Sequence, residues 1–443
     1  MTKEVLKKLL DEKKYKSIHE VLSQYNPVDL ANLLAEMDSE DLVVVFRMLK
    51  KDKAAEVFSY MDNDLRHELI SLFSKQEIKN ILDSMFTDDA VDFLSDMPAN
   101  VVSQLLENVD SETRADINHL LQYPDDSVGS IMTVEFVELS PQMTVKDAFD
   151  KIRVTGINSE TVYTCYVVQK HKLLGIVSAK DLMTSEYETK ISDLMNDKFI
   201  YVNTLDDREY AANLFRKYDL IALPVLDSEE FIVGIVTFDD AIDVLTEEAT
   251  DDMNKMAAMS SSDDPYLKTS VWEHAKHRIP WLLILMFSAT LTGMILAKYE
   301  AAFSAMPILV TFIPMLSSTG GNCGSQSATL IIRGLSVDEI RFSDTLKVIW
   351  KEFRVSVIVS IVLALANGLR IFLVYHDITL ASVISLSLIF TVIASKMFGC
   401  MLPIAAKRIN LDPALLASPI ISTIVDVFSM LIYFTIATSI FNL

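Results

Sequence analysis

The sequence predicts a multidomain membrane protein, with soluble domains first and an all-α transmembrane domain last. Three observations predict this organisation. Apolar residues recur every 12 positions in the first part, a longer pattern is duplicated over residues 128–248, and long apolar runs fill the chain from 279 onward. The predicted order is therefore an α-helical short-repeat superhelix, a duplicated α/β module, an acidic connecting helix and a five-helix membrane domain.

The charge distribution separates the two halves of the chain. Residues 1–264 hold 26 Lys and Arg against 52 Asp and Glu, whereas the rest holds 13 against 9. An acidic front repels nucleic acid and attracts small cations, especially divalent ones. Cys165, Cys323 and Cys400 are too scattered for a disulfide framework or a zinc site.

Residues 1–127 are predicted to form a helical repeat domain. Apolar residues stand twelve apart along it: Met37, Leu49, Met61, Phe73, Met85, Met97, Val109 and Leu121. Twelve residues allow about two helical turns and a connection, and helices that short are stable only when stacked. Asp88, Asp92 and Asp96 share one helical face, where like charges repel and a cation would relieve them.

A different repeat fills the next 120 residues. Ser130–Thr133 recurs as Asp193–Asn196, and Gly175–Asp181 recurs as Gly234–Asp240. Each copy combines a helical segment with short β runs. The segment resembles a tandem pair of CBS domains, which pack as one regulatory module. The predicted domains are residues 128–190 and 191–245.

The CBS resemblance implies one further ligand. In CBS pairs that bind adenine nucleotides, a Ser/Thr-x-x-Asp motif after the Gly strand contacts ribose and phosphate. The matching residues are Ser178 with Asp181 and Thr237 with Asp240. ATP or another adenine nucleotide is thus a minor candidate ligand, which the acidic surroundings disfavour.

Residues 246–272 are predicted to form an acid-rich connecting helix. Glu247 with Asp251, and Glu248 with Asp252, are pairs of like charge at i, i+4, and each pair destabilises the helix by a few tenths of a kcal/mol. A solvated linker is the alternative. The apolar face formed by the methionines of this segment favours a partner surface instead.

Residues 273–443 are predicted to form the transmembrane domain. The five predicted spans are 279–298, 303–332, 349–375, 380–406 and 413–441. Lys and Arg cluster before the first span and in the loops after the second and fourth spans, so the positive-inside rule places the N-terminus in the cytosol and the C-terminus outside. The N-terminus has no signal-peptide core. We therefore expect a multi-pass plasma-membrane protein with cytoplasmic N-terminal and CBS domains.

The last span carries one carboxylate, Asp426, near its middle. An Asp there costs roughly 2.5–3.5 kcal/mol on insertion scales. This cost favours a face turned to a pore, and Pro419, two turns earlier, is expected to kink the helix. A structural pair with Lys396 is the alternative, although we favour a Lys396 that reaches the cytoplasmic interface.

The second span is unusual for its glycines and amides. Gly320, Gly321 and Gly324 permit either a broken helix or close helix packing. Packing alone does not account for Asn322 and Gln326, because their amides need hydrogen-bond partners.

The whole pattern resembles the MgtE-type magnesium channels and transporters. The motifs that carry the resemblance are Tyr266–Trp272, Gly321–Thr329, and Leu411–Pro419 followed by Asp426. The resemblance implies a homodimer in the lipid bilayer with one pore. Asp426 would bind Mg²⁺ in that pore, and cytosolic acids would bind regulatory Mg²⁺.

The resemblance and the residue pattern give the candidate sites. Pore-lining candidates are Gly321, Asn322, Gln326, Ser418 and Pro419. Regulatory metal candidates are Asp88, Asp92, Asp96, Asp239, Asp240, Asp243, Glu247, Glu248, Asp251, Asp252 and Asp412. The expected function is Mg²⁺ influx down its electrochemical gradient, closed by cytosolic Mg²⁺. Alternatives are a coupled carrier of Mg²⁺, Co²⁺ or Mn²⁺ and a CBS nucleotide-sensing membrane protein. No nucleophile–base constellation or P-loop indicates an enzyme.

Overall fold

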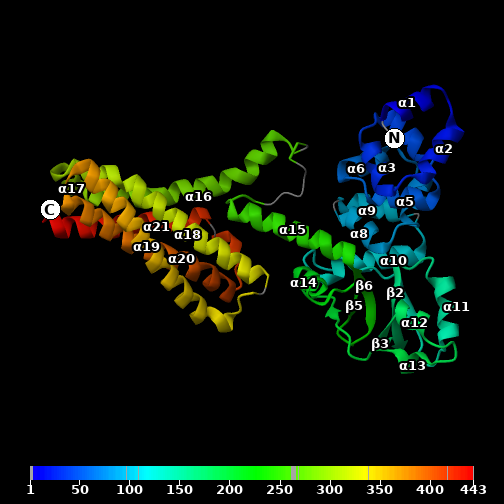
Figure 1. Ribbon diagram of the computed structural model, residues 1–443. Helices are drawn as coiled ribbons and strands as arrows, with labels where there is room; N and C mark the ends of the chain where they lie inside the picture. The colour runs from blue at the N-terminus through cyan, green and yellow to red at the C-terminus, as the bar shows by residue number, and fades with distance from the viewer. Residues whose placement is uncertain are drawn as a thin grey trace. The chain divides into compact units, whose positions relative to one another are not determined.

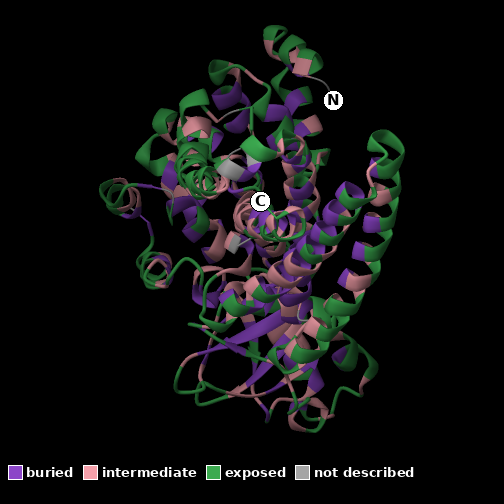
Figure 2. Cartoon of the chain, turned by 90° about the vertical axis from the view of Figure 1, so that its left-hand side faces the viewer, coloured by how far each residue is buried: buried purple, intermediate pink, exposed green. Residues whose placement is uncertain are grey.

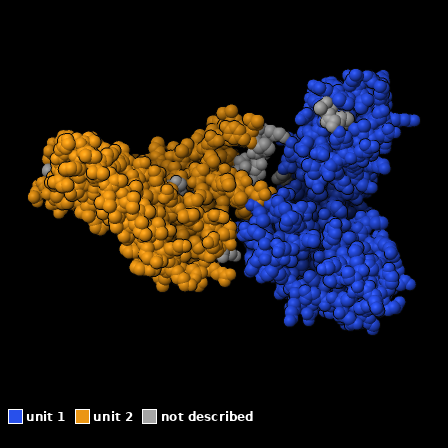
Figure 3. All heavy atoms as spheres, viewed as in Figure 1, with its two compact units in different colours: residues 1–245 blue, residues 246–443 orange. Residues whose placement is uncertain are grey.

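The computed structural model describes residues 3–95, 97–107, 109–260, 266–267, 269–337, 339–416 and 418–442. The chain forms two compact units, residues 1–245 and residues 246–443 (Figure 3). Each unit is described separately below, because each has its own core.

The first unit opens with ten short helices (Figure 1). They are α1 (Lys3–Asp11), α2 (Tyr15–Gln24), α3 (Pro27–Ala35), α4 (Ser39–Phe46), α5 (Lys51–Ser59), α6 (Asn63–Leu72), α7 (Lys75–Leu82), α8 (Thr87–Ser95), α9 (Ala99–Leu106) and α10 (Ser111–Leu120). Helices α3 to α10 start about every 12 residues, which confirms the predicted repeat. Capping side chains begin several of them, as where Ser74 and Glu77 form a reciprocal capping box.

The repeat positions fill the core between these helices. Met61, Met85 and Met97 are at most 8% exposed. The rings of Phe58 and Phe93 meet edge to face, with centroids 5.0 Å apart. The helices are too short to be stable alone, so this stacking supplies their stability.

Two small sheets of the same topology follow. The first contains β1 (Phe136–Leu139), β2 (Thr161–Gln169) and β3 (Lys172–Ser178), and the second contains β4 (Val202–Asn203), β5 (Ala222–Leu226) and β6 (Ile232–Thr237). In both, the first strand is parallel to the second and the third is antiparallel to it. This identity confirms the predicted duplication. Strand β5 is buried along its whole length and β6 along most of it, and buried strands show in purple in Figure 2.

Helices accompany these sheets. They are η1 (Val128–Ser130), α11 (Val145–Thr155), α12 (Ala179–Thr184), α13 (Ile191–Leu194) and α14 (Arg208–Tyr218). Helix α15 (Phe238–Met256) directly follows β6 and carries the chain into the second unit.

Every regular element that the structure describes in the second unit is a helix. Its elements are α16 (Val271–Lys298), α17 (Glu300–Ala305), η2 (Pro307–Phe312), α18 (Ile313–Ser336), η3 (Phe342–Asp344), α19 (Thr345–Tyr375), α20 (Ile378–Arg408), η4 (Pro413–Leu416) and α21 (Ser418–Phe441). Among the described residues, α16, α19, α20 and α21 are long and apolar enough to cross a membrane.

Helix α18 lies where the second of five spans was predicted. It has 24 residues, but its glycines and polar side chains keep it out of the set of sufficiently apolar helices. Five spans therefore remain a prediction. The helix is continuous, so of the two alternatives left open for this segment, a broken helix and close packing, the structure shows close packing.

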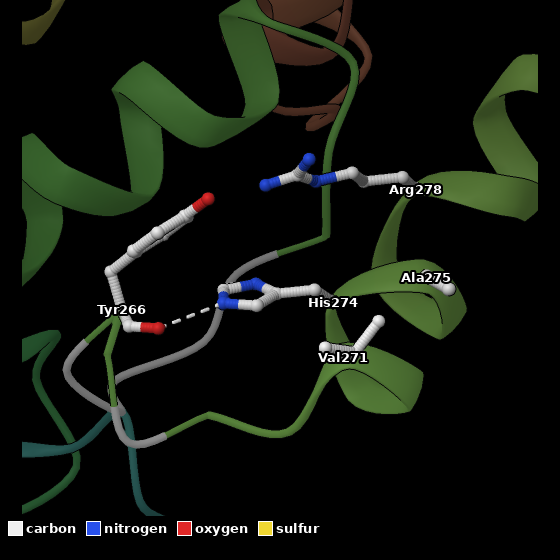
Figure 4. Close-up of a pocket in the computed structure, with 5 residues that line it drawn as sticks. All are labelled: Tyr266, Val271, His274, Ala275 and Arg278. Atoms are coloured by element: carbon white, nitrogen blue, oxygen red, sulfur yellow. Dashed lines mark hydrogen bonds between the residues drawn. The ribbon is translucent and has the colours of Figure 1, made fainter.

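The start of α16 lies before its apolar run. His274 donates a hydrogen bond from Nε2 to the backbone oxygen of Tyr266, at 3.0 Å. An open pocket of about 310 Å³ is lined by Tyr266, Val271, His274, Ala275 and Arg278 (Figure 4). Aromatic and basic residues beside an apolar run are typical of a membrane–water boundary. The motif Tyr266–Trp272 therefore belongs to the entry of the first span.

Candidate functional site

Glycines bring α18 against α21. A Cβ atom on Gly320 would lie 2.8 Å from Cγ1 of Val425, and one on Gly324 would lie 2.8 Å from Cγ2 of Ile421. Such approaches leave no room for a side chain. The glycines are thus explained by close packing, as in other membrane helices with small residues at their interfaces.

Helix α18 also contacts α20 through backbone atoms. A Cβ atom on Gly399 would lie 2.2 Å from the carbonyl oxygen of Gly324. Helix α18 is therefore held between α20 and α21, and this position fixes which of its faces remains open.

Asp426 lies on α21, half-buried and beside α18. On α18, the hydroxyl of Ser317 interacts with this carboxylate, although it has no hydrogen bond that meets the geometric criteria among the described residues. One turn earlier on α21, Ser422 lies 3.3 Å from where a Cβ of Gly321 would stand. Gly321 thus lets α21 approach α18 at the level of the acid.

Pro419 does not kink α21, and that expectation is wrong. It is the second residue of the helix, where a missing N–H is tolerated because the first turn has no intrahelical acceptor for it. Its carbonyl oxygen accepts a hydrogen bond from Thr423 Oγ1 at 3.0 Å. The side chain of Ser418, another pore-lining candidate, lies outside the described residues.

Asn322 and Gln326 are exposed side chains on α18. They stand at i, i+4 and share one face with Ser318, which is also exposed. The amides have no hydrogen-bond partner in the part of the chain that the structure describes. A polar stripe of this kind cannot face lipid, so it faces water or another protein surface.

Lys396 is neither paired with Asp426 nor extended to the interface. It is 5% exposed, and its Nζ donates a hydrogen bond to Ser327 Oγ at 3.2 Å. The preferred expectation of an interfacial Lys396 is therefore wrong. Within the described residues Asp426 has no ion-pair partner, which leaves its charge available.

A second group of acids gathers in the first unit. Asp88 and Asp89 begin α8, Asp239 and Asp240 begin α15, and Glu160 lies in the turn before β2. Helix N-termini stabilise carboxylates, which accounts for four of the five positions. The fold thus brings together acids that are up to 152 residues apart in the sequence.

Burial and mutual repulsion shift the pKa values of these acids. Burial, followed by the charge of Asp239, raises the pKa of Glu160 to about 8. Burial raises the pKa of Asp240 to about 7 and that of Asp89 to about 6, with neighbouring carboxylates adding to both shifts. Burial and Asp240 raise the pKa of Asp88 as well. The group stores unfavourable negative charge that a cation would neutralise.

Cations of the protein itself compensate this group only in part. Arg66 lowers the pKa of Asp89, but its ion pair is with Asp92 at 3.0 Å. Oε2 of Glu160 is buried without a hydrogen-bond partner. No three acidic, His or Cys side chains of the described residues stand together in metal-ligand geometry.

The predicted regulatory acids divide into several groups. Asp88, Asp239 and Asp240 join the buried group, whereas Asp92 is exposed and paired with Arg66, so the predicted helical face does not converge. Asp96 lies outside the described residues. Asp243 follows on α15, where burial and then the charges of Asp239 and Asp92 raise its pKa, and Glu247 and Glu248 lie farther along the same helix.

Sequence reasoning missed two acids of this region. Glu160 follows no helical pattern that would have marked it. Glu135 accepts hydrogen bonds from Thr87 and from Thr133, the latter at 2.5 Å. Only the folded arrangement places either of them near Asp88.

The end of α15 meets the membrane helices within the second unit. Lys255 forms ion pairs with Asp251 and, at 2.5 Å, with Asp412. Asp252 accepts a hydrogen bond from Ser336 at 3.3 Å, and burial together with Asp412 raises its pKa. The apolar side chain of Met256 packs in the cluster that α18 and α21 form. The predicted partner surface is thus met in part: Met256 packs on the membrane helices, whereas Met253 of the same predicted face is 70% exposed.

The candidate nucleotide-binding residues form hydrogen bonds with one another. Ser178 Oγ donates a hydrogen bond to Asp181 at 2.6 Å, and Thr237 Oγ1 donates to Asp240 at 2.6 Å. Ser178 and Asp181 form the reciprocal capping box of α12. Both motifs thus have a structural role at helix starts, and the second lies among acids that disfavour a phosphate.

These features define a class of protein: a membrane-embedded cation transporter with an acid-rich soluble module. A model of the divalent cation transporter family called MgtE matches residues 313–436, a model of the MgtE intracellular N domain matches 25–126, and CBS domain models match 128–188 and 191–247. The chain belongs to the MgtE family of divalent cation transporters, and it is not an enzyme.

Relatives match over nearly the full length. The magnesium transporter MgtE of Thermus thermophilus is 35% identical over 98% of this chain and 97% of its own, and that of Bacillus subtilis is 32% identical over 97% and 95%. The cytosolic domain of the Mg²⁺ channel MgtE in complex with ATP is a similar solved structure, at 35% identity and a TM-score of 0.51, covering 54% of this chain and 98% of that one. The soluble part of a magnesium transporter, at 30% identity, gives 0.54 and covers 56% and 98%.

Proposed function

We propose that this protein conducts Mg²⁺ across the plasma membrane, down its electrochemical gradient, through a pore lined by α18 and α21. The observation that carries the proposal is Asp426, which has no ion-pair partner among the described residues and interacts with Ser317 of α18, the helix that also exposes Asn322 and Gln326. Mg²⁺ releases its water shell reluctantly, so a pore for it needs charge and polar groups rather than a tight cage. Full-length relatives named magnesium transporters support the choice of ion.

A second copy of the chain would complete the pore. Asn322 and Gln326 lie on a face that one chain leaves open and that lipid does not satisfy. A two-fold axis along this face would set two Asp426 carboxylates around one path. Two facing carboxylates attract a divalent ion more strongly than a monovalent one.

The proposed orientation follows from charge. Arg333 lies in the last turn of α18, Arg341 and Lys347 follow it, and Lys407 and Arg408 end α20, so these segments would face the cytosol with the soluble unit. The C-terminus would then lie outside.

We also propose that cytosolic Mg²⁺ closes the pore. Without the ion, the buried acids around Glu160 repel one another and favour a loose soluble unit. Bound Mg²⁺ would favour the compact unit and hold α15 in place, with Lys255 docked at Asp412. The ion shifts this equilibrium only by its higher affinity for the compact state.

Flux through proteoliposomes tests the transport proposal. With a Mg²⁺ gradient alone, the wild type should take up Mg²⁺ and Asp426→Asn should not. Uptake that survives this substitution would place the ion site elsewhere. Uptake that requires a proton or sodium gradient would favour a coupled carrier, and no uptake with tight nucleotide binding would favour a sensor.

ATP is a second candidate ligand. A relative's cytosolic domain has been solved in complex with ATP. Here the hydroxyl of Ser178 would have to leave Asp181 to reach a ribose or phosphate. Calorimetry with ATP on wild type and Ser178→Ala decides this, because unchanged binding would move the site away from that motif.

A further inference from the structure

A chain of polar groups joins three helices inside the membrane domain. Lys396 on α20 donates to Ser327 Oγ on α18 at 3.2 Å, and Ser327 donates to Glu352 Oε2 on α19 at 2.8 Å. Ser327 is fully buried, Lys396 is 5% exposed and Glu352 is half-buried. The hydroxyl thus bridges a buried cation and an anion.

Lys396 lies deep within a predicted membrane helix, which makes this series of polar groups energetically costly. It lies 12 residues before the end of α20, which is about 18 Å of helix. An ionisable side chain within a span is expensive, and those that occur commonly serve a transport path. Asp426, the carboxylate of the proposed pore, makes no ion pair with Lys396 among the described residues. The lysine therefore has a role other than neutralising the ion site.

Packing holds α18 between its neighbours, and Ser327 adds hydrogen bonds to that packing. Gly320 and Gly324 present backbone to α20 and α21, while larger apolar side chains of α18 pack beside them. Ser327 follows Gln326 by one residue, about 100° around the helix, and lies on the buried side. Its two hydrogen bonds therefore add a directional constraint on where the Asn322 and Gln326 amides point.

We propose that Lys396 and Glu352 are positioning residues for ion selection: through Ser327 they hold α18 at the rotation that presents Asn322 and Gln326 to the pore. They touch no ion themselves. This inference rests on the proposed pore. It adds a determinant of selectivity that lies behind the pore helix, on two helices that do not line the path.

The experiment measures Mg²⁺ and K⁺ flux in proteoliposomes. Removal of one partner alone would leave an unpaired buried charge and risk misfolding, whereas removal of both commonly preserves stability. The principal variant is therefore Lys396→Met with Glu352→Met, and Lys351→Gln, an exposed lysine beside Glu352, is the control. Monodispersity and a thermal midpoint near that of the wild type establish that each variant is folded.

The double variant should still pass Mg²⁺ but lose its preference for Mg²⁺ over K⁺ by about tenfold, the size of effect expected for coupled neighbours. The control should keep the wild-type preference. A folded double variant with wild-type preference would overturn the inference. If the double variant does not fold, Ser327→Ala takes its place, and an unchanged preference there would overturn it equally. Absence of Mg²⁺ flux in the wild type would instead refute the proposed function.

Discussion

Lys255, near the end of α15, lies between two acids and forms an ion pair with Asp412 at 2.5 Å. Asp412 lies just before η4 and α21. Burial lowers the pKa of Lys255, but its hydrogen bonds with Asp251 and Asp412 raise this pKa above its usual range. The lysine therefore keeps its charge at physiological pH. It ties the connecting helix to the segment that leads into the helix of Asp426.

Lys255→Met should weaken closure by Mg²⁺. Without the lysine, Asp251 and Asp412 face each other uncompensated, so more Mg²⁺ is needed to hold α15 in place. We expect the Mg²⁺ concentration that halves flux to rise about tenfold, a typical coupling free energy. Lys347→Met is the matched control, because Lys347 forms its ion pair with Asp344 at an exposed site. An inhibition curve that Lys255→Met leaves unchanged would refute the role of this contact.

Glu160→Gln should stabilise the soluble unit when Mg²⁺ is absent. With its pKa raised to about 8, the buried Glu160 must either take up a proton or carry an uncompensated charge, and a neutral amide removes that cost. We expect amide hydrogen exchange in α8 and β2 of the full chain to slow by about tenfold in chelator. Added Mg²⁺ should then slow exchange less than in the wild type. Glu138→Gln, at an exposed position on β1, should change neither result.

The same acids predict how stability depends on pH. The pKa values of Glu160, Asp240 and Asp89 are raised to about 8, 7 and 6. The folded state therefore holds protons that the unfolded chain releases near pH 4, and stability contributed by these groups falls as the pH rises from about 4 to about 8.

Thermal unfolding followed by far-UV circular dichroism tests this dependence. In chelator, the first unit should melt at a higher temperature at pH 5 than at pH 8. Mg²⁺ should raise the melting temperature more at pH 8, where the carboxylates are ionised and available. Equal effects of Mg²⁺ at the two pH values would show that these acids do not bind it.

Much of the fold was predictable because it rests on local periodicity. The twelve-residue apolar spacing marked the helices that Met61 and Met85 pack between, and the repeated Gly-Ile-Val segments at Gly175 and Gly234 marked the two sheets. Each such signal lies within a few residues of the element it forms. The absence of a kink at Pro419 was not predictable in this way, because proline is tolerated in the first turn of a helix but kinks a helix when it lies in the middle.

The site was less predictable because it depends on contacts between distant segments. Asp426 could be predicted as a candidate because a lone acid within an apolar run is costly to place in a membrane. Nothing near Glu160 in the sequence indicates that the fold buries it beside Asp240. The partner of Lys396 was equally hidden, since Ser327 is an ordinary small residue until α18 and α20 are packed together.

Gly399→Ala should destabilise the membrane domain. Its Cβ would lie 2.2 Å from the Gly324 carbonyl oxygen, and neither backbone can move without separating α18 from α20. Overpacking of this kind costs about 1–3 kcal/mol. Gly293→Ala on α16 is the control, because its Cβ would meet nothing within 4 Å. The three tryptophans of the chain all lie after residue 270, so their fluorescence during thermal unfolding in detergent reports on this domain. The midpoint should fall for Gly399→Ala alone, and an equal midpoint for both variants would mean that the two helices are not in backbone contact.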